Sequence, residues 1–293
     1  MNLALTLLEI VAPVFLLAGA GFVWVRAGFE YRVEFVTRLA MTLSVPCLIF
    51  VALMRAEIDP KALTALSFAA VAAYAVLTVA AAIMVRVTGL SMRPFLAPLI
   101  FGNTGNLGLP LALFAFGDVG LSYAVIVFAI MALWSFTFGI WVVAGGGSMT
   151  RALKEPLLWA TVLGGIFLWQ GWQTPRWITN TLELTGQMAI PLMLLTLGVA
   201  VARLNPGKLV QAMALSVVKV GLCVAVAWVL GRAFALDDVA FAVLVVQIAT
   251  PVAVTSYLLA EKYGADSDAV AGLVVASTLA SVIYLPLVLA AVL

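Results

Sequence analysis

The sequence predicts an all-α integral membrane protein with ten membrane-spanning helices, arranged as two five-helix halves of opposite orientation. Long apolar runs, a repeat between the halves and paired interruptions in two of the runs indicate this fold. Of the 293 residues, 65% are hydrophobic and 10% are charged, and the mean hydropathy is +1.21. Soluble domains average about 45–50% apolar and about 25% charged residues. The chain is therefore predicted to reside in a lipid bilayer.

Ten runs are long enough to cross the membrane, for which a helix needs about 20 mostly apolar residues. Clusters of charged residues, Pro or Gly separate these runs. The predicted spans are residues 4–25, 36–54, 62–86, 94–116, 119–144, 157–172, 178–202, 208–231, 239–260 and 269–291. No Lys or Arg precedes Arg26, whereas a signal peptide begins with basic residues, so the first run is predicted to be retained.

The basic residues of the connecting loops predict the orientation of the chain, because cytoplasmic loops carry an excess of Lys and Arg. The odd-numbered loops contain Arg26, Arg32, Arg38, Arg86, Arg93, Arg151, Lys154, Arg203, Lys208 and Lys262. The even-numbered loops contain Arg55, Lys61, Arg176 and Arg232. Both termini are therefore expected outside the cytoplasm. The net charge of +2 is too small to indicate a nucleic-acid partner.

The two halves of the chain resemble each other at an offset of about 146 residues, which indicates an internal duplication. The matches pair Gly19, Phe22, Trp24, Pro46 and Pro60 with Gly164, Phe167, Trp169, Pro191 and Pro206, and Thr104, Gly117 and Ala124 with Pro251, Gly264 and Ala271. The predicted repeats are residues 1–147 and 148–293. Because five helices is an odd number, the second copy must enter the membrane from the opposite side, which gives an inverted repeat.

The fourth and ninth predicted helices should be interrupted at equivalent positions. Gly costs about 1 kcal/mol and Pro about 3 kcal/mol in a helix interior, and lipid cannot satisfy the backbone groups that a break exposes. The candidate binding residues at these breaks are Asn103, Thr104, Gly105, Asn106 and Pro110 in the fourth helix, and Gln247, Thr250, Pro251 and Thr255 in the ninth. The two breaks are expected to meet near the membrane midplane. Their half-helix N-termini would attract an anion.

Ionisable residues inside the predicted spans are functional candidates, because a buried charge in a membrane is costly. Lys219 is the deepest, about eleven residues into the eighth helix. It is expected to lie beside the interruptions as a fixed cation, to pair with Glu183 or with carbonyls of the interruptions, or to snorkel to the membrane surface. Glu9 and Glu183 lie early in their helices, where they could take part in proton coupling, form an ion pair or simply reach the membrane surface.

Enzymatic chemistry is not indicated by the residues of the predicted spans. The chain has no histidine, and the predicted spans contain no paired carboxylates or metal-ligand cluster, so acid–base and metal catalysis lack their usual groups. Cys47 and Cys223 lie inside apolar runs, as small buried hydrophobes do. We therefore expect no metal and no cofactor.

The interrupted helices contain the segments Asn103–Pro110 (Asn-Thr-Gly-Asn-Leu-Gly-Leu-Pro), Ala249–Pro251 (Ala-Thr-Pro) and Ala260–Gly264 (Ala-Glu-Lys-Tyr-Gly). In these segments the chain resembles the auxin efflux carrier family, which includes bacterial malonate and malate permeases. This resemblance implies the crossover fold of bile-acid symporters and sodium/proton antiporters, with a scaffold of residues 1–55 and 150–204 and a moving transport domain of residues 60–145 and 206–293. The resemblance also implies an elevator mechanism, a homodimer formed through the scaffold and a bacterial inner-membrane location.

The same resemblance implies a small mono- or dicarboxylate substrate, whose carboxylate meets Asn103, Thr104, Asn106 and the Thr250–Pro251 turn. The third helix has no acidic residue at its middle, and carboxylates suited to sodium are not evident near the interruptions. Lys219 is therefore expected to take the place of a cation, with transport uniport-like or proton-linked.

An anion channel and a membrane ligand sensor without transport are the alternatives. A channel would need a continuous polar pore, and the chain contains no soluble signalling domain.

Overall fold

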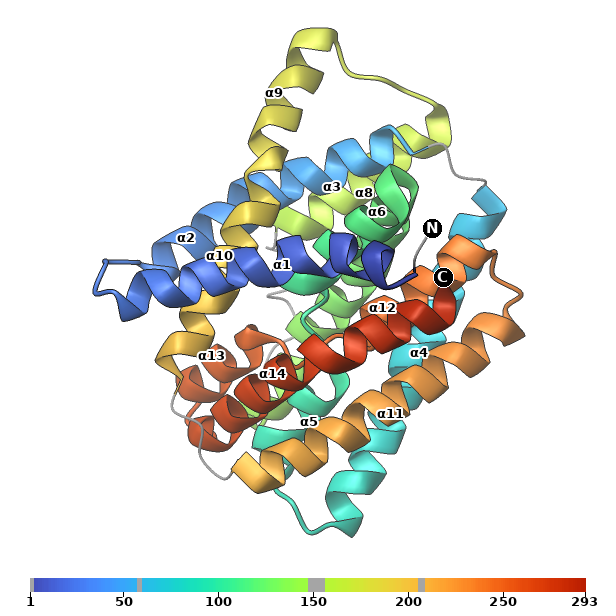
Figure 1. The fold of residues 1–293 in the computed structure, drawn as a ribbon. Coiled ribbons are helices and arrows are strands. Elements are labelled where there is room, and N and C mark those ends of the chain that lie inside the picture. The colour runs from blue at the N-terminus through green and yellow to red at the C-terminus, as the bar shows by residue number, and fades with distance from the viewer. Residues whose placement is uncertain (1–2, 57–59, 147–155, 205–208) are drawn as a thin grey trace.

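The computed structural model describes residues 3–56, 60–146, 156–204 and 209–293, and these ranges are helical apart from their connections (Figure 1). The predicted boundary between the halves at 147/148 lies outside them, as do Arg151, Lys154, Pro206 and Lys208. Within the described residues, seven helical stretches are long and apolar enough to cross a membrane. The chain therefore has the features of a multi-pass integral membrane protein.

The first half contains α1 (Leu3–Arg26), α2 (Val33–Leu39), the π-helical turn η1 (Ala40–Ser44), α3 (Val45–Met54), α4 (Pro60–Val87), α5 (Met92–Ile100), the π-helical turn η2 (Thr104–Gly108), α6 (Leu109–Trp134), the π-helical turn η3 (Ser135–Gly139) and α7 (Ile140–Ala144). The second half contains α8 (Pro156–Gln170), α9 (Arg176–Gln187), α10 (Ala189–Arg203), α11 (Leu209–Ala233), α12 (Asp238–Ile248), α13 (Val254–Lys262) and α14 (Ser267–Val292).

Several predicted spans are shorter or less regular than a simple membrane helix. The fourth is split into α5 and the start of α6, and the ninth into α12 and α13. Gly117 inside α6 has φ +63° and ψ −154°, a conformation that glycine adopts readily. It separates the fourth predicted span from the fifth. Helix α8 has 15 residues, which makes it the shortest uninterrupted helix that corresponds to a predicted span.

Glycines set the close packing of α1, α3, α8, α9 and α10. A Cβ on Gly198 of α10 would overlap the Ala18 carbonyl of α1, and one on Gly21 would overlap the Leu195 carbonyl. Gly164 of α8 lies against Leu53 in the same way. Small residues at such contacts let two backbones approach closely, which is how helices associate where no hydrophobic effect drives them together.

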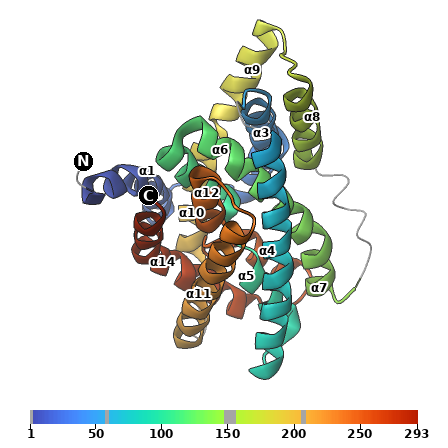
Figure 2. The same ribbon diagram turned by 90° about the vertical axis from the view of Figure 1, so that its right-hand side faces the viewer.

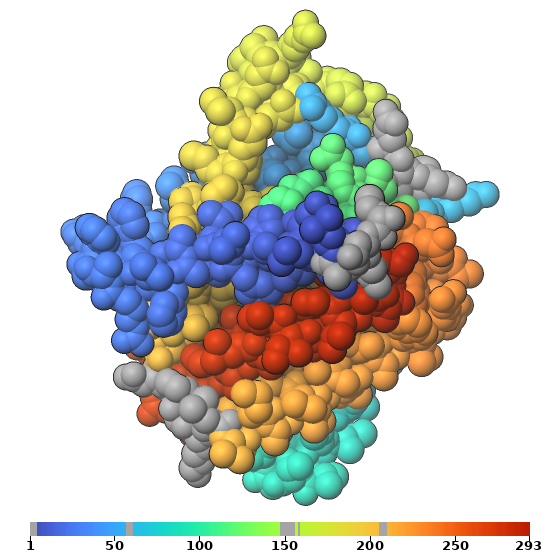
Figure 3. All heavy atoms as spheres, in the orientation of Figure 1, coloured from blue at the N-terminus to red at the C-terminus, as the bar shows by residue number. Residues whose placement is uncertain are grey.

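A second group of helices surrounds the interruptions: α4, α5, α6, α11, α12 and α14 pack mainly on one another. Helix α14 also lies beside α1 on one face of the molecule, and the start of α1 lies near the end of α14 (Figures 2 and 3). Two polar side chains make hydrogen bonds at the ends of these helices. The Tyr123 hydroxyl donates to Asp237, the N-cap of α12, at 3.0 Å. The Arg93 guanidinium donates to the carbonyls of Val143 at 3.0 Å and Tyr263 at 2.8 Å.

Candidate functional site

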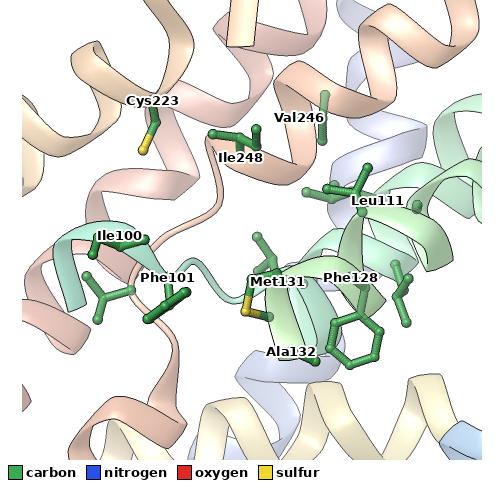
Figure 4. Close-up of a cluster of buried hydrophobic side chains, with 14 of the residues drawn as sticks. Ile100, Phe101, Leu111, Phe128, Met131, Ala132, Cys223, Val246 and Ile248 are labelled. Atoms are coloured by element: carbon green, nitrogen blue, oxygen red, sulfur yellow. The ribbon is translucent and has the colours of Figure 1, made fainter. Parts of the chain in front are cut away.

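The two interrupted helices meet, as the sequence predicts. Helix α5 ends at Ile100 and α12 at Ile248, and the non-helical residues that follow them run antiparallel through a bridge between Gly102 and Val252. The Asn103 N–H donates to the Pro251 carbonyl at 2.6 Å. Figure 4 shows the two connections passing each other among buried apolar side chains that include Ile100, Phe101 and Ile248. We call the residues 101–108 and 247–255 the crossover.

The glycines of the crossover allow polar side chains of one break to touch the backbone of the other. A Cβ on Gly102 would overlap Thr250 Oγ1, and a Cβ on Gly108 would overlap Gln247 Oε1. Gly105 lies against the Phe128 ring, which would be 3.1 Å from an added Cβ. Each glycine is thus required by a specific neighbour, which explains why three of them occur within seven residues.

Buried polar atoms at the crossover lack hydrogen-bond partners among the described residues. They are Asn103 Nδ2, Thr104 Oγ1 and both the oxygen and the nitrogen of the Gln247 amide. The exposed fractions of these side chains are 5%, 0% and 0%. An unpaired buried polar group costs about 1–3 kcal/mol, so a cluster of them indicates a place that water or a ligand completes.

Two helix N-termini beside this cluster favour a negatively charged ligand. The π-helical turn η2 begins at Thr104 and leads directly into α6, and α13 begins at Val254. The first N–H groups of a helix have no carbonyl partner within it, and the N-terminal end carries a partial positive charge. The crossover therefore presents two helix N-termini beside uncharged hydrogen-bonding side chains, an arrangement that suits an anion.

Lys219 lies beside the crossover and is 3% exposed. Its Nζ donates to the Thr250 carbonyl at 3.0 Å and lies 3.9 Å from Cys223 Sγ. Of the partners considered from the sequence, the crossover carbonyl is therefore correct and Glu183 is wrong, because Glu183 forms an ion pair with Arg55 instead. Glu9 is exposed on the surface of α1.

Asn106 and Thr255 line a small cavity of about 50 Å³ beside the crossover. Thr37 and Thr196 line its other side, from α2 and α10. The Thr196 hydroxyl is 2.8 Å from that of Tyr31, and partial burial raises the pKa of Tyr31 above its ordinary value, so this phenol stays protonated at neutral pH. A water molecule needs roughly 10–15 Å³ of such space, so the cavity has room for a few waters or for the carboxylate end of a ligand.

A family profile described as "Membrane transport protein" matches residues 6–147 and 142–289, nearly the whole chain. The chain belongs to the auxin efflux carrier family. It is also 31% identical over 193 residues to an uncharacterized transporter of Methanothermobacter thermautotrophicus. The matched stretch covers 63% of this chain and 63% of that relative.

Within this auxin efflux carrier family member, some predicted site residues have structural partners. The Thr250 hydroxyl donates to the Gln247 carbonyl at 2.7 Å, while the carbonyls of Thr250 and Pro251 are occupied by Lys219 and by the Asn103 N–H. Pro110 is buried in the first turn of α6, where its missing N–H is tolerated.

The structure also adds residues that the sequence did not single out. Ser277 of α14 accepts a hydrogen bond from the Val252 N–H at 2.9 Å and so fixes the second break. Thr37 and Thr196 join the site only through the packing of α2 and α10. A lone Thr in an apolar helix gives no such signal, because its hydroxyl usually bonds the carbonyl one turn earlier, as Thr196 does with Leu192.

A larger cavity of about 570 Å³ opens between α3, α6 and α9. Arg55 and Glu183 line it together with Asp118 and Gln187. Beside it, the Ser122 hydroxyl donates to the Ala52 carbonyl at 3.0 Å, which links α6 to α3. The large cavity and the small one are both lined by helices from the predicted scaffold and from the predicted transport domain.

Proposed function

We propose that the protein is a secondary transporter for small organic anions, whose carboxylate binds at the crossover. The observation that carries this proposal is the set of buried, unpartnered polar atoms on Asn103, Thr104 and Gln247. A carboxylate accepts several hydrogen bonds, and Asn103 Nδ2, the Thr104 hydroxyl and Gln247 Nε2 can all donate. Binding would therefore satisfy groups that are otherwise costly to bury.

The helix N-termini supply the remaining preference for an anion. Backbone N–H groups at Thr104, Gly105 and Asn106 begin η2, and those at Val254 and Thr255 begin α13. A carboxylate near these ends interacts favourably with both partial positive charges. Thr250 and Pro251 then act by holding the two breaks together, while Asn106 and Thr255 line the cavity through which the ligand enters.

In this proposal the chain has ten membrane spans arranged as an inverted repeat of five plus five. Three findings support it. The interruptions α5–α6 and α12–α13 occupy matching places in the two halves, and the family profile matches the chain in two segments that divide near residue 145. The packing of α1 on α10 also has a counterpart in the packing of α8 on α3, as the repeat requires.

The mechanism we propose is elevator-type alternating access, with residues 1–55 and 150–204 as scaffold and residues 60–145 and 206–293 as the moving body. The two cavities support it, because each lies where these two groups of helices meet. Sliding of the moving body would open one cavity and close the other. A channel is disfavoured because the cavity at the crossover is only about 50 Å³.

Lys219 enters this mechanism as a fixed cation. Its ammonium group lies near the C-terminal end of α12, where a helix carries partial negative charge and a bound metal cation would otherwise be favourable. Transport is therefore expected to proceed without sodium. We further propose a homodimer formed through the scaffold, in a bacterial inner membrane, with both termini outside.

Ligand-dependent thermal stabilisation of the purified protein tests the binding site. A screen of small mono- and dicarboxylates, with and without sodium, should find ligands that raise the melting temperature of the wild-type protein independently of sodium. Asn103→Ala and Asn106→Ala should remove that stabilisation while the unliganded proteins stay folded. Unchanged stabilisation in both variants would place the ligand elsewhere and refute the proposed site.

A further inference from the structure

Lys219 gives the crossover an unbalanced charge. Neither of the ion pairs among the described residues, Arg32–Glu30 and Arg55–Glu183, involves this lysine. The contacts of its Nζ are the Thr250 carbonyl at 3.0 Å and Cys223 Sγ, on the same helix α11, at 3.9 Å. Within the described residues, the crossover itself is built from uncharged side chains. The site therefore holds a positive charge with no carboxylate to neutralise it.

The Lys219 side chain is held by backbone groups at helix ends. Its Nζ donates to the Thr250 carbonyl, just beyond the C-terminal end of α12. The C-terminal end of α5 also lies close to Thr250, because Gly102 follows that end by two residues and packs directly on Thr250. Both helix ends carry partial negative charge. They hold the ammonium group in place but do not cancel its full charge.

We propose that the crossover is balanced for a ligand with one negative charge, so that it selects singly charged carboxylates over dianionic dicarboxylates. This inference rests on the proposed function and narrows its substrate class. One carboxylate with Lys219 makes the loaded site electrically neutral. A second carboxylate would be buried without a counter-charge, which is strongly unfavourable at membrane depth.

The far side of the small cavity supports the same selection. Apart from Asn106 and Thr255, the residues that line this cavity are Val33, Thr37, Ala40, Met41, Met193, Thr196, Val254 and Leu258, all of them uncharged. A second carboxylate at the other end of a short ligand would meet hydroxyl groups and apolar side chains, with no cation among them. An apolar or hydroxylated tail fits this lining better.

Pairs of ligands that are similar in size but differ in charge test this preference for singly charged carboxylates at a single pH. Succinate and malonate carry two charges at about pH 8, and their monomethyl esters carry one at nearly the same size. Isothermal titration calorimetry with the purified full-length protein should give dissociation constants at least about tenfold lower for the monoesters. Equal or tighter binding of the dianions overturns the inference and leaves the proposed function standing. If neither the two pairs nor propionate bind, the proposed function itself fails.

Added charge provides the complementary test. Thr255 is exposed and lines the small cavity, so Thr255→Lys can fold and adds a cation to the site. The preference for the monoester over succinate should shrink to less than about threefold in Thr255→Lys and stay at the wild-type value in the matched control Thr255→Gln. Lys219→Arg should keep the preference, because it keeps the charge. If Thr255→Lys prefers the monoester over succinate as strongly as the wild-type protein does, the proposed selection by charge is wrong.

Discussion

Replacement of Gly102 by alanine tests whether the crossover depends on direct contact between the two breaks. The added Cβ would overlap Thr250 Oγ1, and would lie 3.0 Å from the Thr250 carbonyl oxygen and 3.3 Å from its Cβ. Thr250 cannot move easily, because its hydroxyl is bonded to the Gln247 carbonyl and its own carbonyl to Lys219. Overpacking of this kind costs about 1–3 kcal/mol. Gly102→Ala should therefore lower the free energy of unfolding by that amount and weaken ligand binding.

The control for this prediction is Gly19→Ala. Gly19 lies within α1, and an added Cβ there would meet nothing within 4 Å. Alanine at an open helical position should stabilise by about 0.4–1 kcal/mol. Denaturant titration of both variants in mixed micelles gives the comparison. Thr250→Ala in the Gly102→Ala background should restore part of the lost stability, because the overlapping hydroxyl is gone. If Gly102→Ala is as stable as Gly19→Ala, the described contact between the breaks is incorrect.

Three further substitutions should change the free energy of unfolding by different amounts. Gln247→Leu should keep or raise stability by about 1 kcal/mol, since neither amide atom has a partner, yet abolish ligand-dependent thermal stabilisation. Arg93→Gln should lower the free energy of unfolding by about 2–4 kcal/mol, because two charged hydrogen bonds to helix-end carbonyls are lost; a loss below about 1 kcal/mol would show that this clamp contributes little. Glu183→Gln should cost less than about 1 kcal/mol, because its partner Arg55 is 53% exposed, and a larger loss would indicate a stronger ion pair.

The crossover could be predicted from the sequence because Gly and Pro residues inside long apolar runs indicate interrupted membrane helices. Asn103–Pro110 and Thr250–Pro251 cannot form continuous helices in lipid, so their interruption and their need for protein partners follow from backbone chemistry. The depth of Lys219 along its helix likewise placed it beside the breaks.

The partners of individual side chains could not be predicted in the same way. Spacing along a helix gives depth, whereas the rotation of the helix about its axis depends on packing. Glu183 was therefore a candidate partner for Lys219, although its side chain pairs with Arg55 on α3. The role of Thr250 could not be predicted either, because its hydroxyl donates to the nearby Gln247 carbonyl and not to a ligand. Residues such as Ser277 and Thr196 reach the crossover only through contacts between distant helices.

The most direct test of the central claim is uptake of a labelled small carboxylate into proteoliposomes. The ligand is chosen from those that stabilise the purified protein, and sodium is left out. Uptake by the wild-type protein and by Gly19→Ala should saturate with substrate concentration, and Gln247→Leu should abolish it while remaining folded. Uptake that rises linearly with concentration, or that persists in Gln247→Leu, would contradict a carrier that binds its substrate at the crossover.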